Sequence, residues 1–137
     1  MKPTCLITGS SGSIGSSLAH KFSQEGFSVL GIDQVLPNHT YCIHTFLCDI
    51  NEVVNSSSAR KVFCSSLVDH SLTSNLSLVI NCAALQPLVD FTLFDVELYQ
   101  KALSVNTVFP LLLYRLLYQS LVSNSGVLIN IGSIHSS

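Results

Sequence analysis

Short apolar segments alternate with helical patterns along the chain. Five apolar segments have the length of buried strands, and they lie at residues 5–7, 27–33, 44–49, 78–81 and 126–131. After the first of them, Ile14, Leu18 and Phe22 recur at helical spacing with Ala19 beside them, and Gly26 then provides a stop signal. This alternation is typical of βαβ units, in which helices cover both faces of a parallel sheet.

Two further helices are predicted after the third apolar segment. The apolar face of the first consists of Ala59, Val62, Phe63 and Leu67. The serines at 56–58 favour a cap at the start of this helix. The second helix is predicted to cover residues 98–121.

These elements together predict a single domain that covers residues 1–137. Right-handed crossovers place the five parallel strands in the order 3-2-1-4-5, which is a three-layer α/β Rossmann fold. The fifth strand is then an exposed apolar edge. Because intact proteins cover such an edge, we expect the C-terminal strands that would follow to be missing from this sequence.

Composition excludes several classes of function. Of the 137 residues, 47% are hydrophobic and 10% charged, and six Lys and Arg with a net charge of -2 argue against nucleic acid. No apolar run approaches the roughly 20 residues that a membrane span needs, and the start has no signal-peptide region, so a cytoplasmic location is expected. The five cysteines are odd in number and contain no Cys-x-x-Cys pair, which predicts neither a disulfide framework nor a metal site.

A glycine-rich segment, residues 8–15, links the first strand to the first helix. Gly9 suits a tight turn, Gly12 lets the backbone approach a pyrophosphate, and Gly15 lets the helix pack closely on the strand. The phosphate charge would then lie at the positive end of the helix. The alternative is an ordinary strand–helix turn. The candidate cofactor-binding residues here are Thr8, Gly9, Ser11, Gly12, Ser13, Ile14 and Gly15.

Asp33 closes the second strand, where an acidic residue accepts hydrogen bonds from the ribose hydroxyls of a dinucleotide. Its charge would also repel a 2′-phosphate, so the predicted cofactor is NAD, with NADP less favoured. The alternative is a solvated Asp at a strand end.

From residue 4 to residue 137 the sequence resembles the short-chain dehydrogenase/reductase family. Five motifs carry the resemblance in the expected order: the glycine turn at 8–15, Cys48-Asp49-Ile50, Asn81-Cys82-Ala83-Ala84, Val105-Asn106 with Pro110, and Asn130-Ile131-Gly132-Ser133. The resemblance implies that Asp49 and Ile50 meet the adenine. It also implies that the segment of Asn81, Ala83 and Ala84 steadies the sheet and passes beside the cofactor.

The same resemblance implies two catalytic residues. Ser133 would hydrogen-bond the oxygen of a small carbonyl or alcohol substrate, and Asn106 would hold a proton relay. Pro110 lacks the N–H that would otherwise bond the Asn106 carbonyl, which leaves that carbonyl free for a water. The alternatives are a polar residue after a strand for Ser133, a satisfied core amide for Asn106, and a helix-entry residue for Asp49.

Two features depart from the family pattern. The spacing of Gly9, Gly12 and Gly15 is more usual in the family's extended branch of epimerases and dehydratases, whereas the later motifs resemble the compact branch. The family's catalytic Tyr-x-x-x-Lys is absent, because none of the four tyrosines has a lysine four positions later. We therefore expect the chain to be a truncated, catalytically incomplete member.

The resemblance thus implies an NAD(P)-dependent oxidoreductase that moves a hydride between nicotinamide and a carbonyl or alcohol. Two alternatives stay open: a non-catalytic dinucleotide-binding module, and an extended-branch sugar-nucleotide epimerase or dehydratase. Leu111, Leu112 and Leu113, with Leu116 and Leu117, form a wider apolar surface than one helix face needs. Core packing explains most of it, and in the family this helix often packs across a subunit interface, so a homo-oligomer is the candidate assembly.

Overall fold

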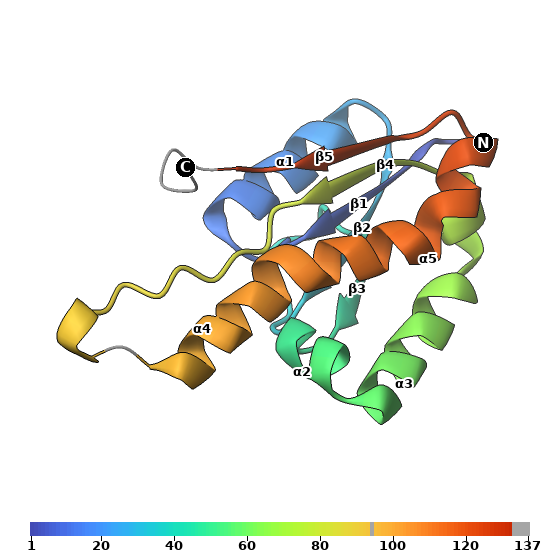
Figure 1. Cartoon of the computed structure of the whole chain (residues 1–137). Coiled ribbons are helices and arrows are strands. Elements are labelled where there is room, and N and C mark those ends of the chain that lie inside the picture. The colour runs from blue at the N-terminus through green and yellow to red at the C-terminus, as the bar shows by residue number, and fades with distance from the viewer. Residues whose placement is uncertain (94, 133–137) are drawn as a thin grey trace.

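A computed structural model describes residues 1–93 and 95–132, and its centre is a five-stranded parallel sheet (Figure 1). The strands are β1 (Thr4–Thr8), β2 (Ser28–Asp33), β3 (His44–Leu47), β4 (Leu76–Asn81) and β5 (Val127–Asn130). Their order is β3-β2-β1-β4-β5 and all four pairings are parallel. The Rossmann arrangement predicted from the apolar segments is therefore confirmed.

Helices cover both faces of the sheet. They are α1 (Ser13–Gln24), α2 (Ile50–Asn55), α3 (Ser57–Val68), α4 (Val96–Leu103) and α5 (Phe109–Ser123). Short 3-10 turns lie at η1 (Ser71–Asn75) and η2 (Phe91–Leu93), and a π-helical turn, η3 (Ser104–Val108), joins α4 to α5. In Figure 1, α1 lies behind the sheet and the other helices lie in front, which makes three layers.

Alternation along β1 divides the core in two. Cys5 and Ile7 point to the side of α1 and pack in a cluster with Ala19. Leu6 points to the opposite side, where it joins a larger cluster that includes Leu113 of α5. Successive side chains of a strand point to opposite faces, so an entirely apolar strand buries both faces only when helices cover both.

The helix predicted over residues 98–121 is interrupted. Pro110 has no N–H to donate to the carbonyl of Asn106, so the regular i to i−4 pattern cannot continue through this turn. The N–H of Phe109 instead reaches the carbonyl of Ser104, five residues back. The helical turn at η3 is therefore wider than an α-helical turn. Such π-turns are frequent at functional sites.

Other details of the helical prediction hold in part. The Ser56 hydroxyl accepts a hydrogen bond from the N–H of Ala59 and caps α3, as predicted. Phe63 and Leu67 are buried, but Val62 is 72% exposed, so its assignment to the apolar face was wrong. Ile14 is also outside the core, with 58% of its surface exposed. Strict helical spacing does not distinguish the edge of an apolar face from its centre.

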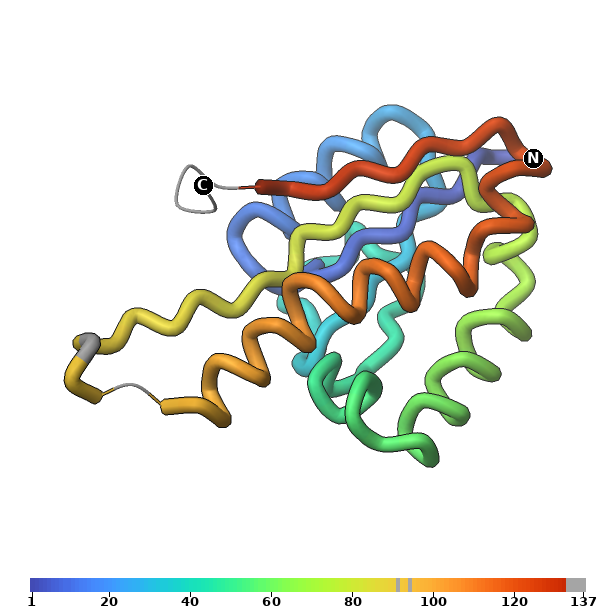
Figure 2. The backbone as a smooth tube through the Cα atoms, in the orientation of Figure 1, coloured from blue at the N-terminus to red at the C-terminus, as the bar shows by residue number. Residues whose placement is uncertain are grey.

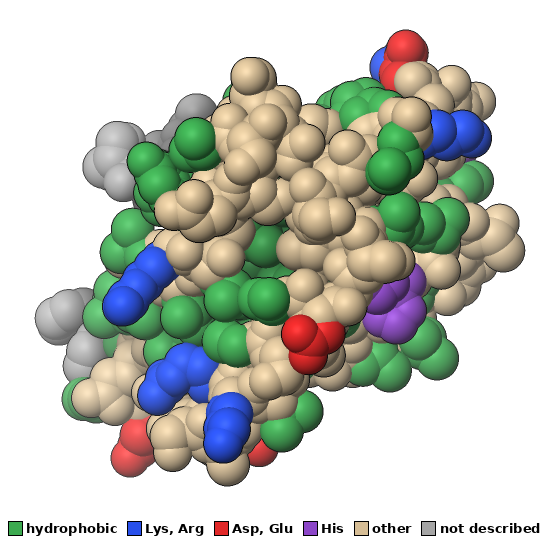
Figure 3. Space-filling model, turned by 90° about the vertical axis from the view of Figure 1, so that its right-hand side faces the viewer, with side chains coloured by type: hydrophobic (Ala, Val, Ile, Leu, Met, Phe, Trp, Pro, Cys, Tyr) green, Lys and Arg blue, Asp and Glu red, His purple; other side chains and the backbone are tan. Residues whose placement is uncertain are grey.

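The surface is weakly charged. On the face drawn in Figure 3, Lys, Arg, Asp and Glu side chains are few and lie among hydrophobic and neutral polar ones. No helix within the described ranges combines the length and apolar character that a bilayer crossing requires. Beyond β4, the chain extends away from the sheet and returns through α4 (Figure 2).

A pair of leucines on α5 tests the packing of the larger cluster. Leu113 is completely buried, so Leu113→Ala is expected to lower the free energy of unfolding by about 2–5 kcal/mol, through lost transfer energy and a cavity. Leu111 is 65% exposed on the same helix, and Leu111→Ala is expected to change stability by less than about 0.5 kcal/mol. Urea denaturation of both variants measures the difference; equal losses would contradict this packing.

Candidate dinucleotide-binding site

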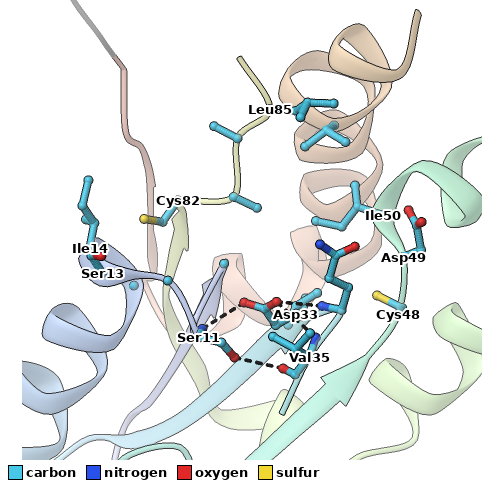
Figure 4. A pocket seen from close by; sticks show the side chains of 18 of the residues that line it. Ser11, Ser13, Ile14, Asp33, Val35, Cys48, Asp49, Ile50, Cys82 and Leu85 are labelled. Carbon is cyan, nitrogen blue, oxygen red and sulfur yellow. Dashed lines mark hydrogen bonds between the residues drawn. The ribbon is translucent and has the colours of Figure 1, made fainter. Parts of the chain in front are cut away.

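A cleft of about 580 Å³ opens at the carboxyl ends of the central strands (Figure 4). Its walls come from the glycine turn after β1, the end of β2, the start of α2, the segment after β4, and the α4–η3 region. Strand order reverses between β1 and β4, and in open α/β sheets ligands bind where the order reverses. The cleft therefore lies where this fold is suited to hold a ligand.

The glycine turn forms the floor of the cleft by close backbone packing. Gly9 has φ of +69°, and a Cβ there would lie 2.9 Å from the Ala83 nitrogen. A Cβ on Gly15 would overlap the carbonyl oxygen of Gly9. Gly12 precedes α1 as its N-cap without a side-chain cap, and the first turn of α1 has no acidic residue. This positive helix end can therefore accept an anion.

Asp33 lies at the end of β2 beside this turn. Its Oδ2 accepts the N–H of Ser11 at 2.9 Å, and its Oδ1 accepts the N–H groups of Gln34 at 2.8 Å and Val35 at 3.3 Å. A carboxylate has about four acceptor positions, so one remains, on Oδ2. Figure 4 shows the Ser11 bond on the side of the cleft formed by the glycine turn. The carboxylate is thus fixed in place with capacity for one more donor.

Asp49 and Ile50 lie across the cleft from the glycine turn. Asp49 caps α2, because its Oδ1 accepts the N–H groups of Asn51 at 2.8 Å and Glu52 at 3.3 Å. The helix-entry alternative is therefore correct for this side chain, although Asp49 and Ile50 also line the cleft. Apart from this alternative for Asp49, helix α2 has no counterpart among the elements predicted from the sequence.

Two cysteines also line the cleft. Burial raises the pKa of the Cys48 thiol to about 12, and the nearby charges of Asp49 and Asp33 act in the same direction. Burial likewise raises the pKa of Cys82 above its usual value. Both thiols are therefore protonated at neutral pH, and neither supplies a thiolate nucleophile.

Thr8 and Asn81 lie behind the cleft wall rather than in it. The Thr8 hydroxyl accepts the N–H groups of Cys82 and Ala83, each at 3.0 Å, and so holds the segment that leaves β4. The side-chain amide of Asn81 donates to Oδ1 of Asn130 at 2.8 Å, across the β4–β5 pair. Both residues position backbone that faces the cleft.

Asn106 fixes the same segment from the other side. Its Oδ1 accepts the N–H of Leu85 and its Nδ2 donates to the carbonyl of Leu85, both at 2.8 Å. Asn106 is exposed, so it is not a core amide. Ser133, the other predicted catalytic residue, lies outside the described residues.

The structure brings together most of the predicted site. All of the predicted cofactor-binding residues except Thr8 and Asn81 line the cleft. Sequence reasoning missed the lining residues Ile32, Gln34, Val35, Cys48, Cys82, Leu85, Lys101 and Val105 as contacts. Most are chain neighbours of predicted residues. Lys101 belongs to none of the sequence motifs. It lines the cleft because it lies one helical turn before Val105, which also lines it.

Fold and cleft together define an α/β protein of the nucleotide-binding Rossmann type. The family model described as short chain dehydrogenase matches residues 3–137, and the chain belongs to this family.

Known relatives agree with this assignment. The chain is 31% identical to the short chain dehydrogenase/reductase dpfgG of Gibberella zeae, over 95% of this chain and 51% of that protein. It thus spans about half the length of this curated relative. A short chain dehydrogenase from Leptospira borgpetersenii with bound NAD+ superposes with a TM-score of 0.81 at 23% identity, covering 98% of this chain and 53% of the other. A short chain dehydrogenase/reductase family oxidoreductase from Brucella ovis, in complex with a partially ordered NAD, superposes with a TM-score of 0.81 at 21% identity. The match covers 100% of this chain and 66% of the other.

The hydroxyl of Thr8 provides a test of how the cleft wall is held. In Thr8→Val the shape is kept, but two backbone N–H groups lose their acceptor, so the free energy of unfolding is expected to fall by about 1–3 kcal/mol. Thr8→Ser keeps the hydroxyl and is expected to be clearly more stable than the valine variant. Urea denaturation gives both values; equal stability of the two variants would contradict the role of this hydroxyl.

Proposed function

We propose that this chain binds NAD in the cleft and forms the cofactor-binding part of an oxidoreductase. The observation that carries the proposal is the arrangement of the Asp33 carboxylate beside the uncapped amino end of α1. One group accepts hydroxyl donors and the other receives a pyrophosphate. A dinucleotide carries both features at adjacent positions.

The remaining walls suit the rest of the cofactor. The pyrophosphate would lie against the glycine turn, and the adenine would lie toward Asp49 and Ile50. Ala83 and Ala84 have small side chains and line the wall after β4, which leaves room for the nicotinamide half. The NAD+ of the Leptospira relative and the partially ordered NAD of the Brucella relative support this choice of cofactor.

Asp33 favours NAD over NADP. Its free acceptor position on Oδ2 suits a ribose hydroxyl, whereas a 2′-phosphate would place like charges together. Lys101 of α4 is the one cation among the lining residues of the described chain. The lining residues from the loop after β2 therefore supply no cation to pair with a 2′-phosphate.

Bound NAD supplies hydride chemistry, and the proposed reaction is oxidation of an alcohol or reduction of a carbonyl in a small molecule. Asn106 would position the segment after β4 beside the cofactor through its two bonds to Leu85. Ser133 would orient the substrate oxygen. No tyrosine in the sequence has a lysine four positions later, so we assign the general acid to none of these residues.

We also propose a homo-oligomer formed through α5. Its outer surface carries an exposed apolar stripe, formed by Leu111, Tyr114, Tyr118 and Val122. The rings of Tyr114 and Tyr118 pack edge to face with centroids 5.7 Å apart. The one charged residue of α5 is Arg115. A second copy of the same helix matches such a surface, because a two-fold interface pairs one patch with itself.

Replacing Asp33 tests the cofactor assignment. Asp33→Ala removes a charge-assisted hydrogen bond of about 1.5–3 kcal/mol, so the Kd for NADH is expected to rise about 10- to 100-fold. The Kd for NADPH is expected to change much less, because the repulsive charge is lost as well. Fluorescence titration of both nucleotides measures the two constants, and thermal unfolding confirms that the variant is folded.

Asp69→Ala is the matched control for this experiment. Asp69 is an exposed residue at the end of α3, outside the cleft lining, so the same change in net charge is expected to leave both constants unchanged. If the wild-type chain binds neither nucleotide, or if Asp33→Ala binds both as the wild type does, the assignment is wrong.

Replacing Tyr118 tests the proposed oligomer. Tyr118→Glu places a charge in the apolar stripe of α5 and is expected to shift the chain to a monomer. Val62→Glu places the same charge on the exposed surface of α3 and is expected to leave the assembly intact. Light scattering coupled to size exclusion gives both masses; a monomeric wild-type chain would refute the proposal.

A further inference from the structure

His39 connects the loop after β2 to the glycine turn. Its Nε2 lies 3.0 Å from the carbonyl oxygen of Ser10, and its Nδ1 lies 3.3 Å from the backbone nitrogen of Tyr41. A carbonyl oxygen only accepts and a backbone N–H only donates. Nε2 therefore carries the proton and donates to Ser10, while Nδ1 accepts from Tyr41.

Ring stacking supports the imidazole in this orientation. The Tyr41 ring stacks on it with centroids 4.8 Å apart and planes at 20°. The Tyr41 ring also stacks on the ring of His20 in α1, with centroids 4.3 Å apart. In the described chain no carboxylate forms an ion pair with His39. The ring is thus a donor to Ser10 in a defined orientation, placed by a three-ring stack.

The acceptor of this bond belongs to a peptide group that also contacts Asp33. The carbonyl of Ser10 and the N–H of Ser11 are parts of one trans peptide, so they point in opposite directions. The carbonyl accepts from His39, and the N–H donates to Asp33 Oδ2 at 2.9 Å. A single peptide plane is therefore held from both sides, by His39 and by the proposed ribose acceptor.

We propose that His39 is a positioning residue that acts on Asp33 through the Ser10–Ser11 peptide and thereby sets the preference of the cleft for NAD. A hydrogen bond to the carbonyl polarises the peptide and strengthens donation by its N–H. It also stops the peptide plane from rotating. The Asp33 Oδ2 atom that accepts from Ser11 is also the atom with a free acceptor position. The position of Oδ2 therefore sets the geometry of its hydrogen bond to a ribose hydroxyl. This inference depends on the proposed binding of NAD.

His39 does not touch the cleft, and the loop is not held by His39 alone. The Ser11 hydroxyl donates to the carbonyl of Val35 at 2.9 Å, which is a second link between turn and loop. Loss of the His39 bond is therefore expected to release the peptide plane without detaching the loop. This separates a positioning effect from general loss of structure.

Two amide substitutions test the proposal as a matched pair. In His39→Gln the amide nitrogen lies as many bonds from Cα as Nε2 and can donate to Ser10. In His39→Asn the amide lies at the distance of Nδ1, so it can meet Tyr41 but cannot reach Ser10. His39→Asn is expected to raise the Kd for NADH about 3- to 10-fold and to lower the preference for NADH over NADPH. His39→Gln is expected to stay within about 2-fold of the wild type.

A double-mutant cycle completes the experiment. In the Asp33→Ala background, His39→Asn is expected to have no further effect on the Kd for NADH, because the residue it positions is absent. Thermal unfolding of each variant separates affinity from folding. If the asparagine and glutamine variants bind alike, or if the asparagine effect persists without Asp33, the proposal is overturned while NAD binding stands. Failure of the wild-type chain to bind NADH overturns both.

Discussion

The close approach of backbones at Gly9 is the constraint on which the rest of the cleft depends. The N–H of Gly9 donates to the carbonyl of Ile32 at 2.8 Å, and a side chain on Gly9 would meet the backbone of Ala83. Gly15 of α1 packs against the Gly9 carbonyl from another direction. The ends of β1, β2 and β4 and the start of α1 are therefore placed relative to one small residue. Bulk at this point would separate all four elements.

Much of this arrangement could be predicted because it depends on local signals. Apolar segments of strand length predicted the five strands, and right-handed crossovers between them predicted their order. The glycine spacing predicted the floor of the cleft, and Asp33 followed from its distance along the chain. For the strands and the glycine turn, the physical cause lies within a few residues or repeats at the period of one element, whereas Asp33 was found by its spacing from the turn.

The remaining features depend on contacts between residues far apart in the sequence. No local signal pairs His39 with Ser10, Asn106 with Leu85, or Lys101 with the cleft. The π-turn at η3 also needs more than the presence of Pro110, because a proline can instead end a helix. The exposure of Val62 and Ile14 depends on how α3 and α1 sit on the sheet. Helical periodicity does not contain that information.

Backbone groups and side chains have different parts in the proposed recognition of a dinucleotide. In the proposed site, the glycine turn and the amino end of α1 would meet a pyrophosphate through backbone groups, which suit any dinucleotide equally well. Discrimination between dinucleotides is proposed for Asp33 at the end of β2, whose carboxylate is held by three backbone N–H groups. One of those donors, Ser11, belongs to the glycine turn itself. The turn proposed to bind the pyrophosphate therefore also orients the carboxylate proposed to favour NAD over NADP.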